Sequence, residues 1–113
     1  MLTLALLLAA APAGPVVKTI HLANNHPKVW QGKCPTKLIF TADLALSRPG
    51  AVKYQWSRSD GGIDAEESIN AAKGGGHAVH YQWELGQSFK GWLKFEDLTD
   101  HKYQFIHFEV KCK

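Results

Sequence analysis

The chain has 113 residues and a formal net charge of +3, and 45% of its residues are hydrophobic against 20% charged. This length fits one domain, and the composition is that of a globular rather than a disordered protein. The basic residues are spread along the chain without a run, unlike the clustered stripe of a dedicated nucleic-acid-binding protein. We therefore expect no nucleic acid among its partners.

The N-terminus predicts a secretory signal peptide. The apolar run from Leu2 to Ala11 is too short to span a bilayer, which needs about 20 residues. Ala11 and Ala13 place small side chains at the two positions that a signal peptidase reads. We expect residues 1–13 to be a signal peptide and residues 14–113 the mature domain. The protein would then be secreted or periplasmic, without a stable membrane span.

Export decides how the two cysteines are interpreted. Cys34 and Cys112 can form only one disulfide, and pairing is the default in an oxidising compartment. That bond would close nearly the whole mature domain. In the chain-entropy model a loop of this length contributes about 4 kcal/mol, a large share of the roughly 5–15 kcal/mol of a typical domain.

The first half of the mature chain alternates apolar and polar residues with the period of a β-strand. One strand is predicted over VVKTIHLAN, and the segment HPKVWQGKCP follows its closing turn NNHP. In TKLIFTADLAL every second residue from Leu38 to Leu46 is apolar. After the turn SRPG, Val52, Tyr54 and Trp56 share one face of VKYQWSR, and we expect this face in the core.

The second half of the mature chain also alternates apolar and polar residues, but the segments that join its strands are harder to assign. IDAEESINAA fits either one helical turn or a weak edge strand, and KGGG, residues 73–76, predicts a flexible connection. Three strands follow, in HAVHYQWEL, GWLKFEDL and YQFIHFEVKC. The last one places Tyr103, Phe105 and His107 on one face and Ile106, Phe108, Val110 and Cys112 on the other. Six or seven short strands without a long amphipathic helix are typical of an all-β sandwich.

Cys34, Trp56 and Cys112 resemble the Cys-Trp-Cys pattern of the immunoglobulin-like fold. More narrowly, GKCPTKLIFTADL, VKYQWSRSDGG, HYQWEL and GWLKFEDL, in this order, resemble small secreted immunoglobulin-like domains of bacteria, a largely uncharacterised family. The resemblance covers about residues 17–113 and implies an antiparallel β-sandwich of about seven strands. Val110 stands where a tyrosine corner would place tyrosine, so we expect the disulfide to join the first core strand to the last strand.

Two of the four tryptophans are candidates for ligand contact. Trp56 and Trp83 share the parity of the core residues, whereas the strand pattern leaves Trp30 and Trp92 undetermined. If exposed, these two indole rings would stack on sugar rings or anchor a protein partner. If buried, they would pack over the edge of a thin sandwich.

The loop over residues 57–67 is the second candidate. It is polar, charged and glycine-hinged, and its candidate contact residues are Arg58, Asp60 and Asp64. Loops at the ends of β-sandwiches often carry binding residues. The alternative is a solvated turn without a partner.

No motif in the sequence predicts a metal, a cofactor or catalysis. His77 and His80 lie three residues apart, which places them on opposite faces of a strand. The acidic cluster in residues 60–67 has no ligand at the final position of a twelve-residue calcium loop. Neither a nucleophile elbow nor the spacing of a catalytic triad occurs.

These observations favour a secreted, non-enzymatic, immunoglobulin-like binding or adhesion module. We expect a monomer whose ligand is an unknown protein or a carbohydrate. One alternative is an exported inhibitor that blocks a hydrolase by inserting the 57–67 loop. Another is a small carbohydrate-binding module that uses exposed tryptophan.

The signal peptide is tested by expressing the full chain in a bacterium and isolating the exported protein. Its intact mass should correspond to a chain that begins at Gly14, because cleavage is expected after Ala13. An exported protein that retains the apolar run from Leu2 to Ala11 would contradict the prediction.

Overall fold

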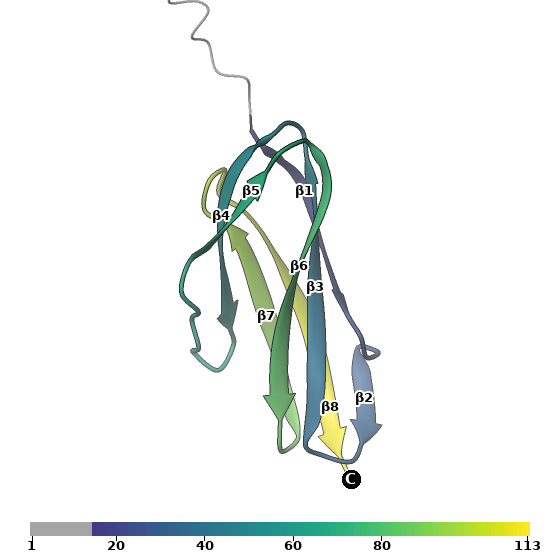
Figure 1. Cartoon of the computed structure of the whole chain (residues 1–113). Coiled ribbons are helices and arrows are strands. Elements are labelled where there is room, and N and C mark those ends of the chain that lie inside the picture. The colour runs from purple at the N-terminus through teal and green to yellow at the C-terminus, as the bar shows by residue number, and fades with distance from the viewer. Residues whose placement is uncertain (1–14) are drawn as a thin grey trace, which may run out of the picture.

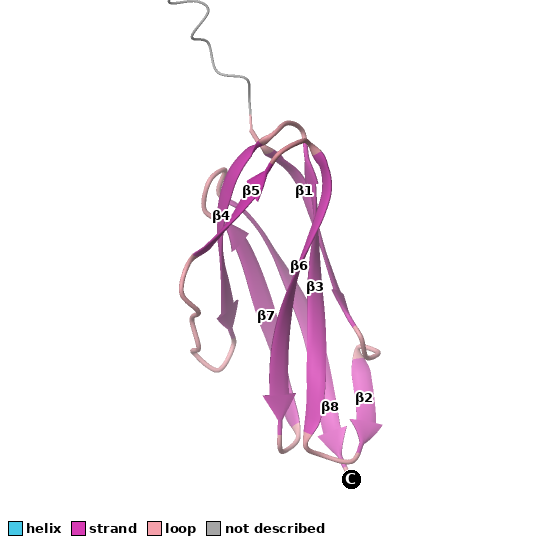
Figure 2. Cartoon of the chain, viewed as in Figure 1, coloured by secondary structure: helices cyan, strands magenta, loops and turns pink. Residues whose placement is uncertain are grey.

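The computed structural model describes residues 15–113, and this part of the chain is all-β (Figures 1 and 2). It contains β1 (Val17–Asn24), β2 (Val29–Gly32), β3 (Thr36–Leu46), β4 (Gly50–Arg58), β5 (Glu67–Ala71), β6 (Gly75–Leu85), β7 (Phe89–Asp97) and β8 (Lys102–Cys112). The expected signal peptide, residues 1–13, lies outside the described residues. Within residues 15–113, no helix has the length and apolar character needed to cross a membrane.

The strands form two sheets that pack face to face as a sandwich. One sheet has the order β1-β3-β6, and the other has the order β2-β8-β7-β4-β5. Neighbouring strands are antiparallel except β2 and β8, which run parallel. The predicted all-β, immunoglobulin-like sandwich is therefore confirmed, with eight strands in the described part of the chain.

Two local predictions are resolved by strand pairing. The ambiguous segment after residue 62 contributes an edge strand, because Glu67–Ala71 pairs with β4. The prediction of a flexible connection over KGGG is wrong for its last two residues. Gly75 and Gly76 belong to β6 and pair with Leu46 and Ala45 of β3. Gly75 has a φ of 101°, which a glycine adopts without steric cost. The ladder satisfies backbone groups that a loop would leave to water.

The core lies between the two sheets and contains the residues that alternation placed inward. Trp56 and Trp83 are 3% and 5% exposed, which confirms both as core residues. The Trp56 ring lies 4.8 Å from that of Phe95, and the Trp83 ring lies 5.2 Å from that of Phe108, both edge-to-face. Such pairs add about 0.5–1.5 kcal/mol each to the stabilisation from burial.

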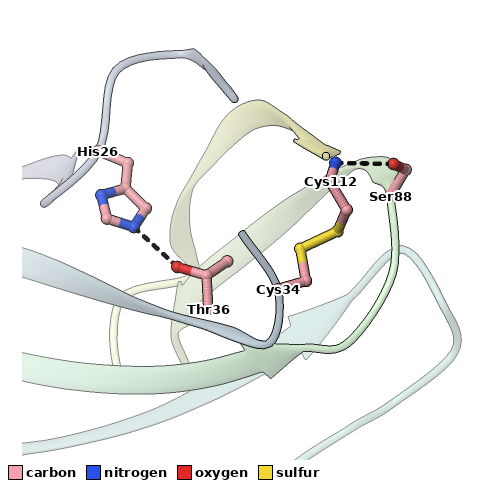
Figure 3. Close-up of a disulfide and its surroundings, with 5 residues drawn as sticks. All are labelled: His26, Cys34, Thr36, Ser88 and Cys112. Carbon is pink, nitrogen blue, oxygen red and sulfur yellow. Dashed lines mark hydrogen bonds between the residues drawn. A yellow bond between two sulfur atoms is a disulfide. The ribbon is translucent and has the colours of Figure 1, made fainter. Parts of the chain in front are cut away.

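A disulfide between Cys34 and Cys112 joins the β2–β3 connection to the end of β8, as expected (Figure 3). The two Cα atoms lie 5.5 Å apart. The backbone N of Cys112 donates to Ser88 Oγ at 2.9 Å, which adds the β6–β7 connection to the same corner. The His26 Nε2 and Thr36 Oγ1 atoms form a hydrogen bond of 3.2 Å close by. This end of the sandwich is therefore closed both covalently and by hydrogen bonds.

Replacing both cysteines, as Cys34→Ser/Cys112→Ser, should lower the free energy of unfolding by about 2–5 kcal/mol, because the bond closes a loop with a sequence separation of 78. Guanidinium titration of the purified variant measures the change. Wild-type protein under reducing conditions is the control and should match the variant. A loss below about 1 kcal/mol would contradict the predicted contribution.

Asp97 and Asp100 organise the opposite end, where the β7–β8 turn meets the start of β1 (Figure 1). Asp97 is fully buried, and its two carboxylate oxygens accept from Thr99 N at 2.9 Å and Asp100 N at 3.2 Å. Asp100 Oδ2 in turn accepts from Val16 N and Val17 N, each at 2.9 Å. Burial raises the pKa of Asp97 above the ordinary aspartate value of 3.8, although the two backbone hydrogen bonds oppose this shift.

Asp97 should make the protein less stable as pH rises. Between pH 3.8 and its raised pKa, the folded state binds more protons at this carboxyl than the unfolded state, so the stabilisation is complete below that window and is lost above it. Asp97→Asn keeps an acceptor for Thr99 N and should flatten this fall, as measured by urea unfolding between about pH 4 and pH 7.

The matched control is Asp43→Asn, because Asp43 is exposed on β3. The control should retain the wild-type pH dependence. The same slope in Asp97→Asn and wild type would show that Asp97 does not cause it.

Candidate functional site

The outer face of the five-stranded sheet carries a group of aromatic side chains that we call the aromatic strip: Trp92 of β7 and Tyr103, Phe105 and His107 of β8. These residues point outward because their neighbours in sequence, such as Leu93 and Phe108, fill the core. Tyr103 is 54% exposed and Phe105 is 43% exposed, which is unusual for rings of this size.

The rings of the strip hold one another in defined orientations. Phe105 lies at its centre, with ring centroids 5.0 Å from Trp92, 5.9 Å from Tyr103 and 6.4 Å from His107. The contacts with Trp92 and Tyr103 are edge-to-face, a favourable aromatic geometry. The Lys94 ammonium lies 4.9 Å from the Tyr103 ring centroid and 5.7 Å from that of Phe105, so a cation–π contact fixes this end.

A groove runs along β8 beside the strip, and we call it the β8 groove. One hollow of about 380 Å³ is lined by Lys90 and Trp92 of β7, His107 and Glu109 of β8, and Lys28 and Val29 on the β2 side. A second hollow of about 330 Å³ shares Lys28 and His107 with it and extends to Phe105. The groove therefore combines aromatic surface with basic and acidic groups at its rim.

The structure separates the two candidate tryptophans. Trp92 is half-buried, lies opposite His107 on the outer face, and belongs to the aromatic strip. Trp30 is also half-buried, but it lies opposite Val110 and therefore faces the core side of the sheet. Its ring stacks on His26 at a centroid distance of 4.8 Å. The two indoles cannot contact one ligand on the same face.

The side chains at the tip of the 57–67 loop are bound to each other. Arg58 Nε donates to Asp60 Oδ1 at 3.0 Å, and the Arg58 guanidinium lies 4.8 Å from the Trp83 ring centroid. Asp60 Oδ1 also accepts from Gly62 N at 2.9 Å. This backbone hydrogen bond, helped by Arg58, lowers the pKa of Asp60. Both candidate residues thus stabilise the conformation of their own turn.

The base of the same loop is tied to the sheet. Ser59 N donates to Trp92 O, and Trp92 N donates to Ser59 Oγ, both at 3.0 Å. The backbone of Asp64 binds Trp56 O through its N at 3.0 Å and accepts from Gln55 Nε2 at 2.9 Å. The loop therefore supports the backbone that presents Trp92.

Tyr103, Phe105 and His107 lie on the face opposite the apolar set, as the alternation of the last strand predicts, but the strand pattern did not indicate them as contact residues. The available signal was three aromatic residues at alternate positions of one strand, on the face that should be polar. Their contact with Trp92 depends on the pairing of β7 with β8. Among residues 15–113, no three His, Cys, Asp or Glu side chains lie together as a metal site.

The fold is similar to a solved structure described as the CARDB domain of the PF1109 protein from Pyrococcus furiosus in complex with di-metal ions. The TM-score is 0.66 at 9% identity, and the match covers 90% of this chain and 100% of that chain. At this identity the likeness shows the fold, a β-sandwich module. No protein-family model matches the sequence, and no curated protein matches it.

Proposed function

We propose that this protein is an exported, non-enzymatic binding module that holds a carbohydrate in the β8 groove. The observation that carries the proposal is the aromatic strip, in which Tyr103, Phe105 and His107 lie exposed along one strand with Trp92 beside them. Contiguous exposed apolar surface on a protein often marks an interaction site or a ligand-binding groove.

The chemistry of the groove matches a sugar. A pyranose ring has an apolar face of C–H groups, which stacks on aromatic rings, and a rim of hydroxyls that both donate and accept hydrogen bonds. Lys28 and Lys90 supply hydrogen-bond donors along the groove, and the Glu109 carboxylate supplies acceptors. A groove with both charges suits hydroxyl groups better than it suits a strongly charged ligand.

A rigid platform also favours binding over catalysis. Strands β7 and β8 pair over nine residues, so little conformational entropy is lost when a ligand settles on their outer face. Glycoside hydrolysis needs a pair of carboxyl groups on either side of the scissile bond. Among the residues that line the β8 groove, Glu109 is the one carboxylate.

Export of the module is supported by two features. The N-terminal sequence has the apolar run and small residues of a signal peptide, and Cys34 and Cys112 form a disulfide. Disulfides persist in oxidising compartments such as the periplasm and the extracellular space.

The alternative of a hydrolase inhibitor has less support. Its loop would have to present Arg58 and Asp60 to a target, but these side chains bind each other and Gly62. Insertion of the loop into a target would have to break these contacts first.

The proposal is tested by affinity electrophoresis through gels that contain xylan, soluble β-glucan, galactomannan or chito-oligosaccharide. At least one of these should retard the wild-type protein. Trp92→Ala and Phe105→Ala should each weaken that binding by roughly three- to tenfold, because each removes one stacking contact.

The matched control is Ile39→Ala, which removes a side chain that is 37% exposed on the outer face of the other sheet. It should bind like wild type. Absence of retardation in every gel, or an equal loss in Ile39→Ala, would exclude the β8 groove as a carbohydrate site.

A further inference from the structure

Strand β6 forms an open edge of the three-stranded sheet (Figure 1). In the described part of the chain, the sheets end in four edge strands, and three of these are short or irregular. β2 has four residues and β5 has five, while β1 shows a register shift near its start and carries Lys18. Such features protect an edge from pairing with another chain.

β6 has none of these protections. It is 11 residues long, and its register with β3 is continuous from Gly75 to Leu85. Its sequence, GGHAVHYQWEL, contains neither proline nor lysine nor arginine. A long, regular edge of this kind presents a row of backbone groups to which another strand can add.

We propose that β6 pairs antiparallel with β6 of a second copy of this chain, centred on Gln82. Direct opposition of the two Gln82 residues places His80 opposite Glu84 of the second copy, and the reverse pair forms by symmetry. Both residues are exposed on the outer face of the strand. A histidine N–H directly opposite a carboxylate can donate a hydrogen bond across the two strands, and such cross-strand pairs stabilise strand pairing.

His80 is already oriented for this role. Its Nδ1 lies 3.0 Å from Thr41 Oγ1 on β3. When the Thr41 hydroxyl donates this bond, the imidazole proton is on Nε2, which can then donate to a carboxylate. The carboxylate in reach in the proposed dimer is Glu84 of the second copy.

The same register also matches the inner side of the strand. Tyr81 meets Trp83 of the second copy, and Val79 meets Leu85. Val79 and Tyr81 are only half-buried in one chain, so pairing would remove more of their apolar surface from water. A groove of about 480 Å³ lies along this part of the edge, lined in part by Arg58, Trp83 and Phe89.

The proposed contact closes on itself. A two-fold axis through Gln82 pairs residues 79–85 of the two β6 strands with each other. Because both copies use the same edge, the contact is closed and the assembly stops at a dimer, which leaves the β8 groove free. The inference goes beyond the proposed function, and it differs from the monomer expected from the sequence.

Sedimentation velocity over micromolar to millimolar concentrations tests the pairing of His80 with Glu84 of the second copy. Wild type should show a concentration-dependent dimer. His80→Glu places the introduced carboxylate of each copy opposite Glu84 of the other, so two pairs of like charges form, and it should raise the dimer dissociation constant about tenfold. The double variant His80→Glu/Glu84→His should restore the constant to within about threefold of wild type.

The control His21→Glu makes the same change on β1 and should leave the constant unchanged. A monomer at every concentration, or addition of a different protein strand to β6 in place of the second copy, would overturn the proposal.

Oxidative cross-linking tests the register independently of charge. Gln82→Cys should form an interchain disulfide, because directly opposed residues of antiparallel strands have Cα atoms about 4.5–5.5 Å apart. Ala78→Cys, on the same outer face, meets residue 86 of the second copy and should remain uncross-linked. Equal cross-linking of both variants, or of neither, would overturn the register centred on Gln82.

Discussion

Strand β8 gives side chains to both faces of the five-stranded sheet, and both the core and the candidate site depend on this division. Its inward residues include Phe108 and Val110, which are nearly fully buried. The pleat then places Tyr103, Phe105 and His107 on the other side. A one-residue slip of β8 against β7 would move every ring to the opposite face. The apolar core therefore fixes the register that holds the aromatic strip together.

The two ends of the sandwich protect that register in different ways. At one end, the Cys34–Cys112 disulfide attaches the end of β8 to the β2–β3 connection. At the other end, Asp97 and Asp100 bind the β7–β8 turn and the beginning of β1 through backbone N–H groups. The first constraint acts mainly on the unfolded chain, whereas the second acts within the folded state at the cost of burying a carboxyl group. The outer face of the five-stranded sheet therefore lies between two ends that are both held by specific contacts.

Strand pattern predicted much of the architecture but little of the site. Alternation identified Trp56 and Trp83 as core residues, and the cysteine pair identified the disulfide. Of the residues selected as contacts, Trp92 lies on the exposed face, Trp30 faces the core side, and Arg58 binds within its own loop. The internal contacts of the loop have a physical reason: a loop that is polar in sequence can satisfy its own polar groups once its turn has formed.

The sequence by itself determined which side of each strand is apolar, because side-chain direction in a strand alternates with a fixed local period. It also determined that one disulfide was possible. Only the tertiary structure decided which strands are neighbours, because pairing joins segments that are far apart in the chain. That pairing placed Trp92 against Phe105, formed the β8 groove and left β6 as a long open edge. Local periodicity therefore defined which face of each strand is apolar. Long-range hydrogen bonding between strands decided which side chains of different strands become neighbours on a face of the sheet.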